Sequence, residues 1–68
     1  MGAEQVHIHS VGNLYMAELL RQMLSEHGIT AFIVNKMDSF YKFGDIELYV
    51  HRDSAIRAKK LINEFETR

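Results

Sequence analysis

The chain has 68 residues, enough for one domain (1–68), and its composition of 47% hydrophobic and 25% charged residues is globular rather than disordered. Eight Lys and Arg against nine Asp and Glu give a net charge of −1, which argues against binding nucleic acids or anionic membranes through bulk positive charge. The absence of Cys excludes disulfide scaffolds, thiol catalysis and cysteine-ligated metals. With no apolar run near the roughly 20 residues that span a bilayer and no N-terminal signal pattern, we expect a cytoplasmic protein.

The first predicted element is a half-buried strand over 6–11, VHIHSV. Apolar and polar side chains alternate there with a period of two, which is typical of a strand with one face in the core. The alternation predicts that Val6 and Ile8 point inward. It also predicts that His7 and His9 lie together on the other face.

A helix over 14–27 follows, with Asn13 as its N-cap and Gly28 as the left-handed residue just beyond its end. Leu14 and Leu19 lie off its apolar stripe, so they are either exposed or touch a partner. The stripe comprises Met16, Ala17, Leu20, Met23, Leu24 and His27.

The second half of the chain predicts two strands and a last helix. Residues 30–35 are β-branched and aromatic, and their continuous apolarity leaves open which face is buried. A long connection over 35–45 leads to a strand over 46–51, and Asp53 or a neighbour caps a helix over 53–66. The expected core side chains of these elements are Ile46, Leu48, Val50, Ala55, Ala58, Leu61, Ile62 and Phe65.

The order β-α-β-β-α predicts an α+β fold, a ferredoxin-like split β-α-β sandwich lacking its last strand. We expect a sheet of order 2-3-1 with both helices on one face, which leaves the other face open and the first strand at an edge. Because 6–11 contains no Pro, Lys or bulge residue that would block pairing, we expect this edge to form a homodimer.

Two segments resemble a family of small bacterial domains described as prokaryotic signal-transducing proteins. They are AELLRQMLSEHGITAFIVN (17–35) and GDIELYVHRDSAIRAKKLI (44–62), and the resemblance extends over about 6–66. The shared pattern is an Asn-led helix with A-E-L-L, a Gly-Ile pair before the second strand, and an A-x-x-A-x-x-L-I helix. Many relatives carry Pro where this chain has His51.

The resemblance implies a PII-like architecture and a regulatory or adaptor role rather than an enzyme. It supplies no catalytic residues. In PII-like proteins the loop between the second and third strands reaches partner proteins. The resemblance therefore implies that the corresponding loop here contacts an unknown protein or small molecule. The candidate contact residues are Phe40, Tyr41, Lys42 and Phe43, with Tyr49 on the adjoining strand. The alternative is that the loop aromatics fold back and extend the core.

A second hypothesis is a metal- or small-ligand-binding module on the open sheet face. If the first and third strands pair, His7, His9, Glu47 and His51 decorate one face, and imidazole with carboxylate suits zinc, nickel or copper. The alternative is that they are polar residues of a solvated surface. His27 is interpreted instead as a residue that caps the first helix.

The sequence gives little support to other classes of function. It has no aromatic RNA-binding motif, no activated nucleophile, no paired carboxylates and no phosphate-binding glycine loop. We therefore expect neither catalysis nor nucleic-acid or membrane binding, and we predict no cofactor.

Overall fold

The computed structural model describes residues 4–35 and 46–67. The predicted order β-α-β-β-α is confirmed, with an additional 3₁₀ turn before the last helix. None of the helices in these two segments is long and apolar enough to span a membrane. The elements are β1 (Gln5–Val11), α1 (Leu14–Glu26), β2 (Ala31–Asn35), β3 (Ile46–His51), the 3₁₀ turn η1 (Arg52–Ser54) and α2 (Ala55–Glu66).

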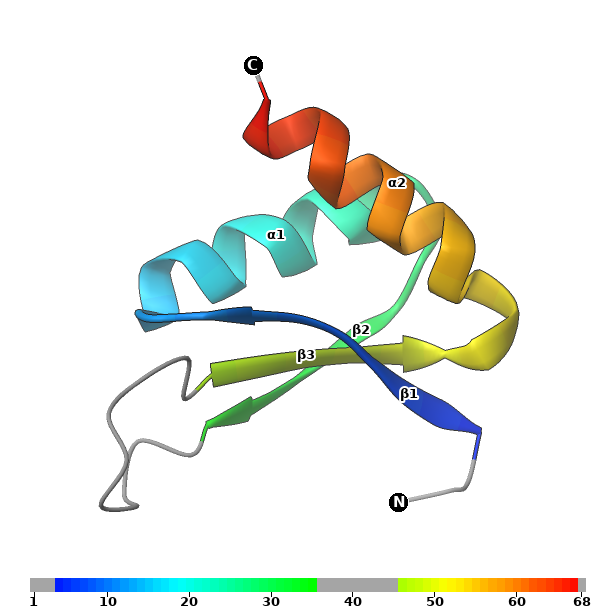
Figure 1. Cartoon of the computed structure of the whole chain (residues 1–68), viewed down its shortest axis with the longest axis horizontal. Helices are drawn as coiled ribbons and strands as arrows, with labels where there is room; N and C mark the ends of the chain where they lie inside the picture. Colours follow the sequence, from blue (N-terminus) through cyan, green and yellow to red (C-terminus); the bar gives the residue numbers. More distant parts are fainter. Residues whose placement is uncertain (1–3, 36–45, 68) are drawn as a thin grey trace.

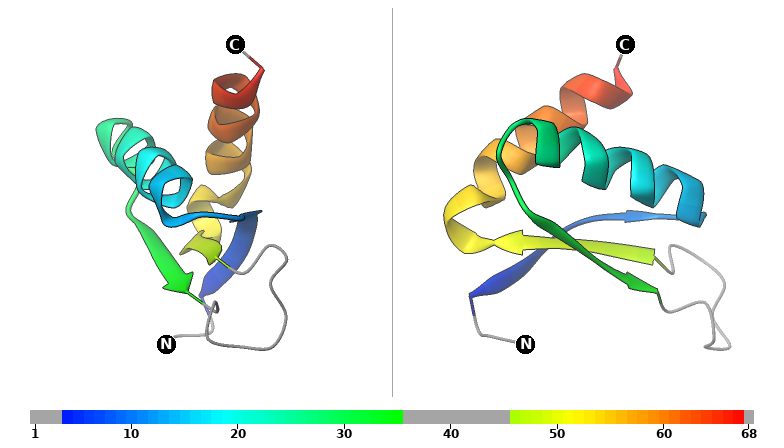
Figure 2. Two further views of the ribbon diagram at one scale, coloured as in Figure 1. Left: turned by 90° about the vertical axis from the view of Figure 1, so that its left-hand side faces the viewer. Right: turned by 180° about the vertical axis from the view of Figure 1, so that it is seen from behind.

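The three strands form one antiparallel sheet in the order β1-β3-β2. Both helices lie on the same side of this sheet (Figure 1), and the view from behind shows the same layering (Figure 2). The chain therefore has the predicted α+β, ferredoxin-like arrangement with sheet order 2-3-1. Both β1 and β2 are edge strands.

The core lies between the helices and the sheet. Ala31 is buried and pairs with Val50, which settles that Ala31 and Ile33 form the face of β2 that turns to the helices. Three expected core residues, Ala55, Leu61 and Phe65, are only partly buried, although all three pack against the core. The largest fully buried side chains are Leu20, Leu24, Ile46, Leu48 and Val50.

Both ends of α1 have the capping geometry that the sequence predicts. The Asn13 side chain accepts a hydrogen bond from the Met16 backbone N–H at 2.8 Å. Gly28 has a φ of 80°, and the Ile29 N–H donates to the Leu24 carbonyl at 2.9 Å. This is a Schellman motif, in which glycine adopts the left-handed conformation without a steric penalty from a Cβ.

Strand β1 contains a β-bulge that the sequence analysis did not predict. His7 pairs with Tyr49 and His9 pairs with Leu48, so Ile8 is an extra residue between two consecutive positions of β3. The bulge changes the alternation so that Val11 pairs with buried Ile46 on the helix side. Strict alternation would turn Val11 away from the core, whereas the bulge buries more apolar surface. The expectation of an unbulged β1 edge is therefore wrong.

Candidate functional site

The face of the sheet opposite the helices gathers several of the candidate residues. In its central row, Tyr49 of β3 lies between Phe32 of β2 and His7 of β1. In the next row, Glu47 lies between Val34 and Ser10. In the described segments, no helix or strand packs against this side (Figure 1). We call it the open face and define it by His7, Ser10, Phe32, Val34, Glu47 and Tyr49.

Short polar contacts order the side chains of the open face. The rings of His7 and Tyr49 meet edge to face, with 5.6 Å between their centroids and 69° between their planes. The Tyr49 hydroxyl donates to Glu47 Oε1 at 2.8 Å, and His7 Nε2 lies 2.7 Å from Ser10 Oγ. Because His7 and Tyr49 are each held by a neighbour, the row contains an ordered pair of rings with polar groups beside it.

Phe32 is the exposed apolar group of this surface, with 48% of its area accessible. It sits on a strand whose ladder with β3 runs in regular register from Ala31 to Asn35. An aromatic ring at such a position provides a large apolar contact area at little cost in conformational entropy. The arrangement suits an aromatic or aliphatic side chain of a binding partner.

His9 does not join the open face, so the prediction that His7 and His9 share a face is wrong. The bulge places His9 opposite Leu48 on the helix side of β1. Its Nε2 lies 2.9 Å from Glu66 Oε2 near the end of α2. His9 therefore links the edge strand to α2 instead of extending the Tyr49 row.

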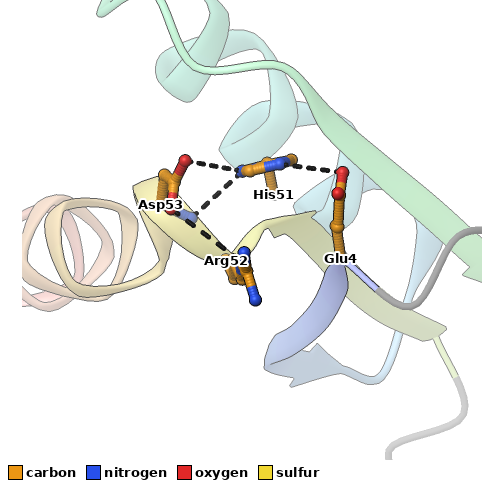
Figure 3. A network of polar contacts seen from close by, with 4 residues as sticks. All are labelled: Glu4, His51, Arg52 and Asp53. Carbon is orange, nitrogen blue, oxygen red and sulfur yellow. Dashed lines mark hydrogen bonds and ion pairs between the residues drawn. The ribbon is translucent and has the colours of Figure 1, made fainter.

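His51 organises the passage from β3 into α2 (Figure 3). Its Nδ1 accepts a hydrogen bond from the Asp53 backbone N–H at 3.1 Å, so the proton of the neutral ring lies on Nε2. That nitrogen lies 3.2 Å from Glu4 Oε1, and the Arg52 backbone N–H donates to the Glu4 carbonyl at 2.8 Å. The imidazole thus caps η1 and ties it to the start of β1.

The cap of α2 therefore differs in detail from the sequence expectation. Ser54 occupies the N-cap position of α2 without a side-chain hydrogen bond, and the capping acceptor is His51, three residues earlier. Capping preferences favour Ser, Thr, Asp and Asn, so imidazole is not recognised as a cap from sequence alone.

The structure separates one of the predicted metal ligands from the others. By register His7, Glu47 and His51 lie on the same side of the sheet, where His51 contacts Glu4, whereas His9 faces α2. The segments 4–35 and 46–67 contain no group of three or more His, Cys, Asp or Glu that could hold a metal ion. The metal hypothesis stays a prediction that a zinc titration by calorimetry would decide, since binding through these ligands releases protons.

The candidate loop residues Phe40, Tyr41, Lys42 and Phe43 lie outside the described segments. Of the five predicted contact residues, the structure places Tyr49, at the centre of the open face. Phe32, which pairs with Tyr49, is not among these predicted contact residues. Its exposure depends on which face of β2 is buried, and the apolar sequence of that strand leaves this open.

The two helices also form a groove that the sequence analysis missed. They diverge as they leave the sheet (Figure 2, left), and their C-terminal halves enclose a groove of about 500 Å³. The predicted cap residue His27 lies at one end, where its Nδ1 lies 2.9 Å from the Met23 carbonyl oxygen. The only indication of this groove in the sequence is Leu19, an apolar residue that lies off the core stripe of α1. Leu19 lines the groove.

Comparison with known proteins does not place the chain in a family. No family model matches it, and neither a curated protein nor a solved structure shows significant similarity to it.

Proposed function

We propose that this chain is a non-enzymatic regulatory or adaptor domain of the prokaryotic signal-transducing type, and that it binds a partner protein through the open face. The observation that carries the proposal is the row of His7, Tyr49 and Phe32, in which an exposed phenylalanine adjoins an ordered tyrosine–histidine pair. Aromatic side chains of this kind dominate the energetics of protein interfaces.

The proposal places the predicted loop residues in the same interface. Strands β2 and β3 flank the segment that carries Phe40, Tyr41, Lys42 and Phe43, and Tyr49 lies on β3 itself. A partner that covers Phe32 and Tyr49 would then contact both the sheet and this segment. The small size of the domain supports such a role, because a 68-residue chain leaves much apolar surface outside its core.

A bacterial, cytoplasmic setting and a homodimer belong to the same proposal. The bulge at Ile8 interrupts the β1 edge, and bulges oppose edge-to-edge pairing. The proposed homodimer therefore forms through a contact other than pairing of two β1 strands. Sedimentation at micromolar concentration tests self-association.

The open face is tested by affinity capture from bacterial cytoplasm with three forms of the protein. They are the wild type, Phe32→Thr, and Tyr15→Thr as a matched aromatic control on α1, where Tyr15 is 72% exposed. We expect a specific partner to bind the wild type and Tyr15→Thr but not Phe32→Thr, and the purified partner to shift the amide resonances of β2 and β3. Equal capture by all three proteins would refute the proposal.

A further inference from the structure

We propose that the groove between α1 and α2 is a second docking site, and that its occupant is an amphipathic helix of a partner protein with Lys or Arg beside an apolar stripe. This surface lies on the helix layer, so the proposal does not depend on the open face. It rests on the apolar floor of the groove, its acidic rim and the position of the two helix ends.

The floor of the groove consists of two apolar pairs. Leu19 and Met23 lie one turn apart on α1, and Leu61 and Phe65 lie one turn apart on α2. All four side chains are only partly buried. Residues four apart form a ridge on a helix surface, and a third helix packs by laying its own side chains between such ridges. Met23 adds a flexible side chain that adapts to different partners.

The rim carries one carboxylate from each helix, Glu26 of α1 and Glu64 of α2, and both residues are exposed. Among the described residues, neither carboxylate has an ion-pair or hydrogen-bond partner. The other described acidic side chains each have at least one contact, so the unpaired carboxylates are those at the groove. The contacts are Glu4 with His51, Glu18 with Arg21, Glu47 with Tyr49, Asp53 with His51 and Arg52, and Glu66 with His9.

The helix ends add to this negative charge. The groove lies between the C-terminal halves of α1 and α2, where the helix dipole contributes a partial negative charge. Neither helix has a basic residue in its last turn. His27 is the basic side chain among the groove residues, and its Nδ1 is engaged with the Met23 carbonyl. The site therefore favours a cationic occupant.

An amphipathic helix satisfies both requirements, because its apolar stripe fills the floor while Lys or Arg side chains reach the rim. A second copy of this chain fits less well. Its basic α2 surface near Lys59 and Lys60 offers a single exposed apolar residue, Ile56, because the apolar stripe of α2 is already packed in its own core. The occupant is therefore a separate protein.

The test uses a fluorescent synthetic peptide of about 18 residues made of Leu, Lys and Ala, with Leu on one stripe and Lys flanking it. Binding to the full chain is followed by anisotropy, and the contacted residues by amide chemical shifts. We expect saturable binding that shifts resonances of α1 and α2. We expect no binding of a peptide with Glu in place of Lys, or of a shuffled peptide that spreads Leu around the helix.

Two groove variants and one matched control separate the site from general charge attraction. Glu26→Gln with Glu64→Gln should weaken binding about threefold to tenfold at low ionic strength, and less in high salt. Leu19→Gln should also weaken it. The control, Tyr15→Lys with Ile56→Lys, changes the net charge by the same two units at exposed positions near the N-terminal ends of α1 and α2, away from the groove, and should bind like the wild type.

Unchanged binding by the groove variants, equal binding of the shuffled peptide, or shifts confined to β2 and β3 would overturn the proposal. A dimer that Leu19→Gln converts to a monomer would identify a second copy as the occupant and would also overturn it. Phe32→Thr should leave peptide binding intact, so failure of the groove is distinguishable from failure of the open face.

Discussion

Truncating Leu20 to Ala tests whether α1 is held to the sheet by the buried stripe. Leu20 is 0% exposed and belongs to the core cluster that includes Leu24, Leu48 and Val50. Leu→Ala substitutions at such sites cost about 2–5 kcal/mol, because the lost transfer free energy is augmented by the cavity that remains. A chain of this length has a total free energy of unfolding of about 3–10 kcal/mol at 0.05–0.15 kcal/mol per residue. We expect Leu20→Ala to lose a large part of its stability.

The measurement is urea denaturation followed by circular dichroism, with Leu14→Ala as the control. Leu14 is on the same helix but 48% exposed, so its truncation should cost less than about 1 kcal/mol. Leu20→Val removes one methylene, costs about 1 kcal/mol and stays measurable if Leu20→Ala is largely unfolded. Equal denaturation midpoints for Leu20→Ala and Leu14→Ala would show that the core face of α1 is not the one described.

Substitutions at three further positions probe the caps of α1 and η1. Gly28→Ala should lower the free energy of unfolding, measured by urea denaturation, by about 1 kcal/mol, and Gly28→Asn should lower it less. No atom lies within 4 Å of an added Cβ, so only the left-handed backbone conformation is penalised. Equal stability of Gly28→Ala and wild type would contradict this. Asn13→Ala should lower the thermal midpoint by the equivalent of about 1 kcal/mol, whereas Asn13→Asp should retain the cap. His51→Ala should speed exchange of the Asp53 amide, and an unchanged rate would argue against the imidazole cap.

Features that depend on neighbouring residues were predictable from sequence. Asn13 and Gly28 mark the two ends of α1. Asn13 accepts a hydrogen bond from a backbone N–H of the first turn, and Gly28 adopts the left-handed conformation just beyond the last turn, so both signals are local in sequence. The strict alternation of 46–51 likewise gave the buried and outward faces of β3. The topology followed from the number of elements, because few arrangements of two helices on a three-stranded sheet obey the crossover rule.

The bulge was not predictable from the same alternation. A period of two over 6–9 turns both histidines outward, but it also turns Val11 away from the core. The extra residue at Ile8 corrects this, because it pairs Val11 with buried Ile46, which is 35 residues after Val11 in the chain. The new position of His9 depends in turn on Glu66 at the end of α2. Such contacts are set by tertiary pairing, which a local pattern does not record.

The groove escaped prediction for a related reason. The apolar stripe that includes Leu61 and Phe65 identifies the inward side of α2, but it gives no information about the angle between the two helices. Since the helices diverge, the inward side of their C-terminal halves faces a groove instead of a closed core (Figure 2). An apolar stripe in a short two-helix layer therefore predicts burial only where the helices stay close.

The positions of the two proposed surfaces lead to a last prediction. The open face lies on one side of the sheet, and the groove lies in the helix layer on the other (Figure 1). An occupant of one surface does not compete for the residues of the other, as expected of an adaptor. We expect the protein saturated with the Leu–Lys peptide to capture its open-face partner with unchanged affinity, and Glu26→Gln with Glu64→Gln to affect only the peptide. Mutual displacement of peptide and partner would show that both bind a single surface.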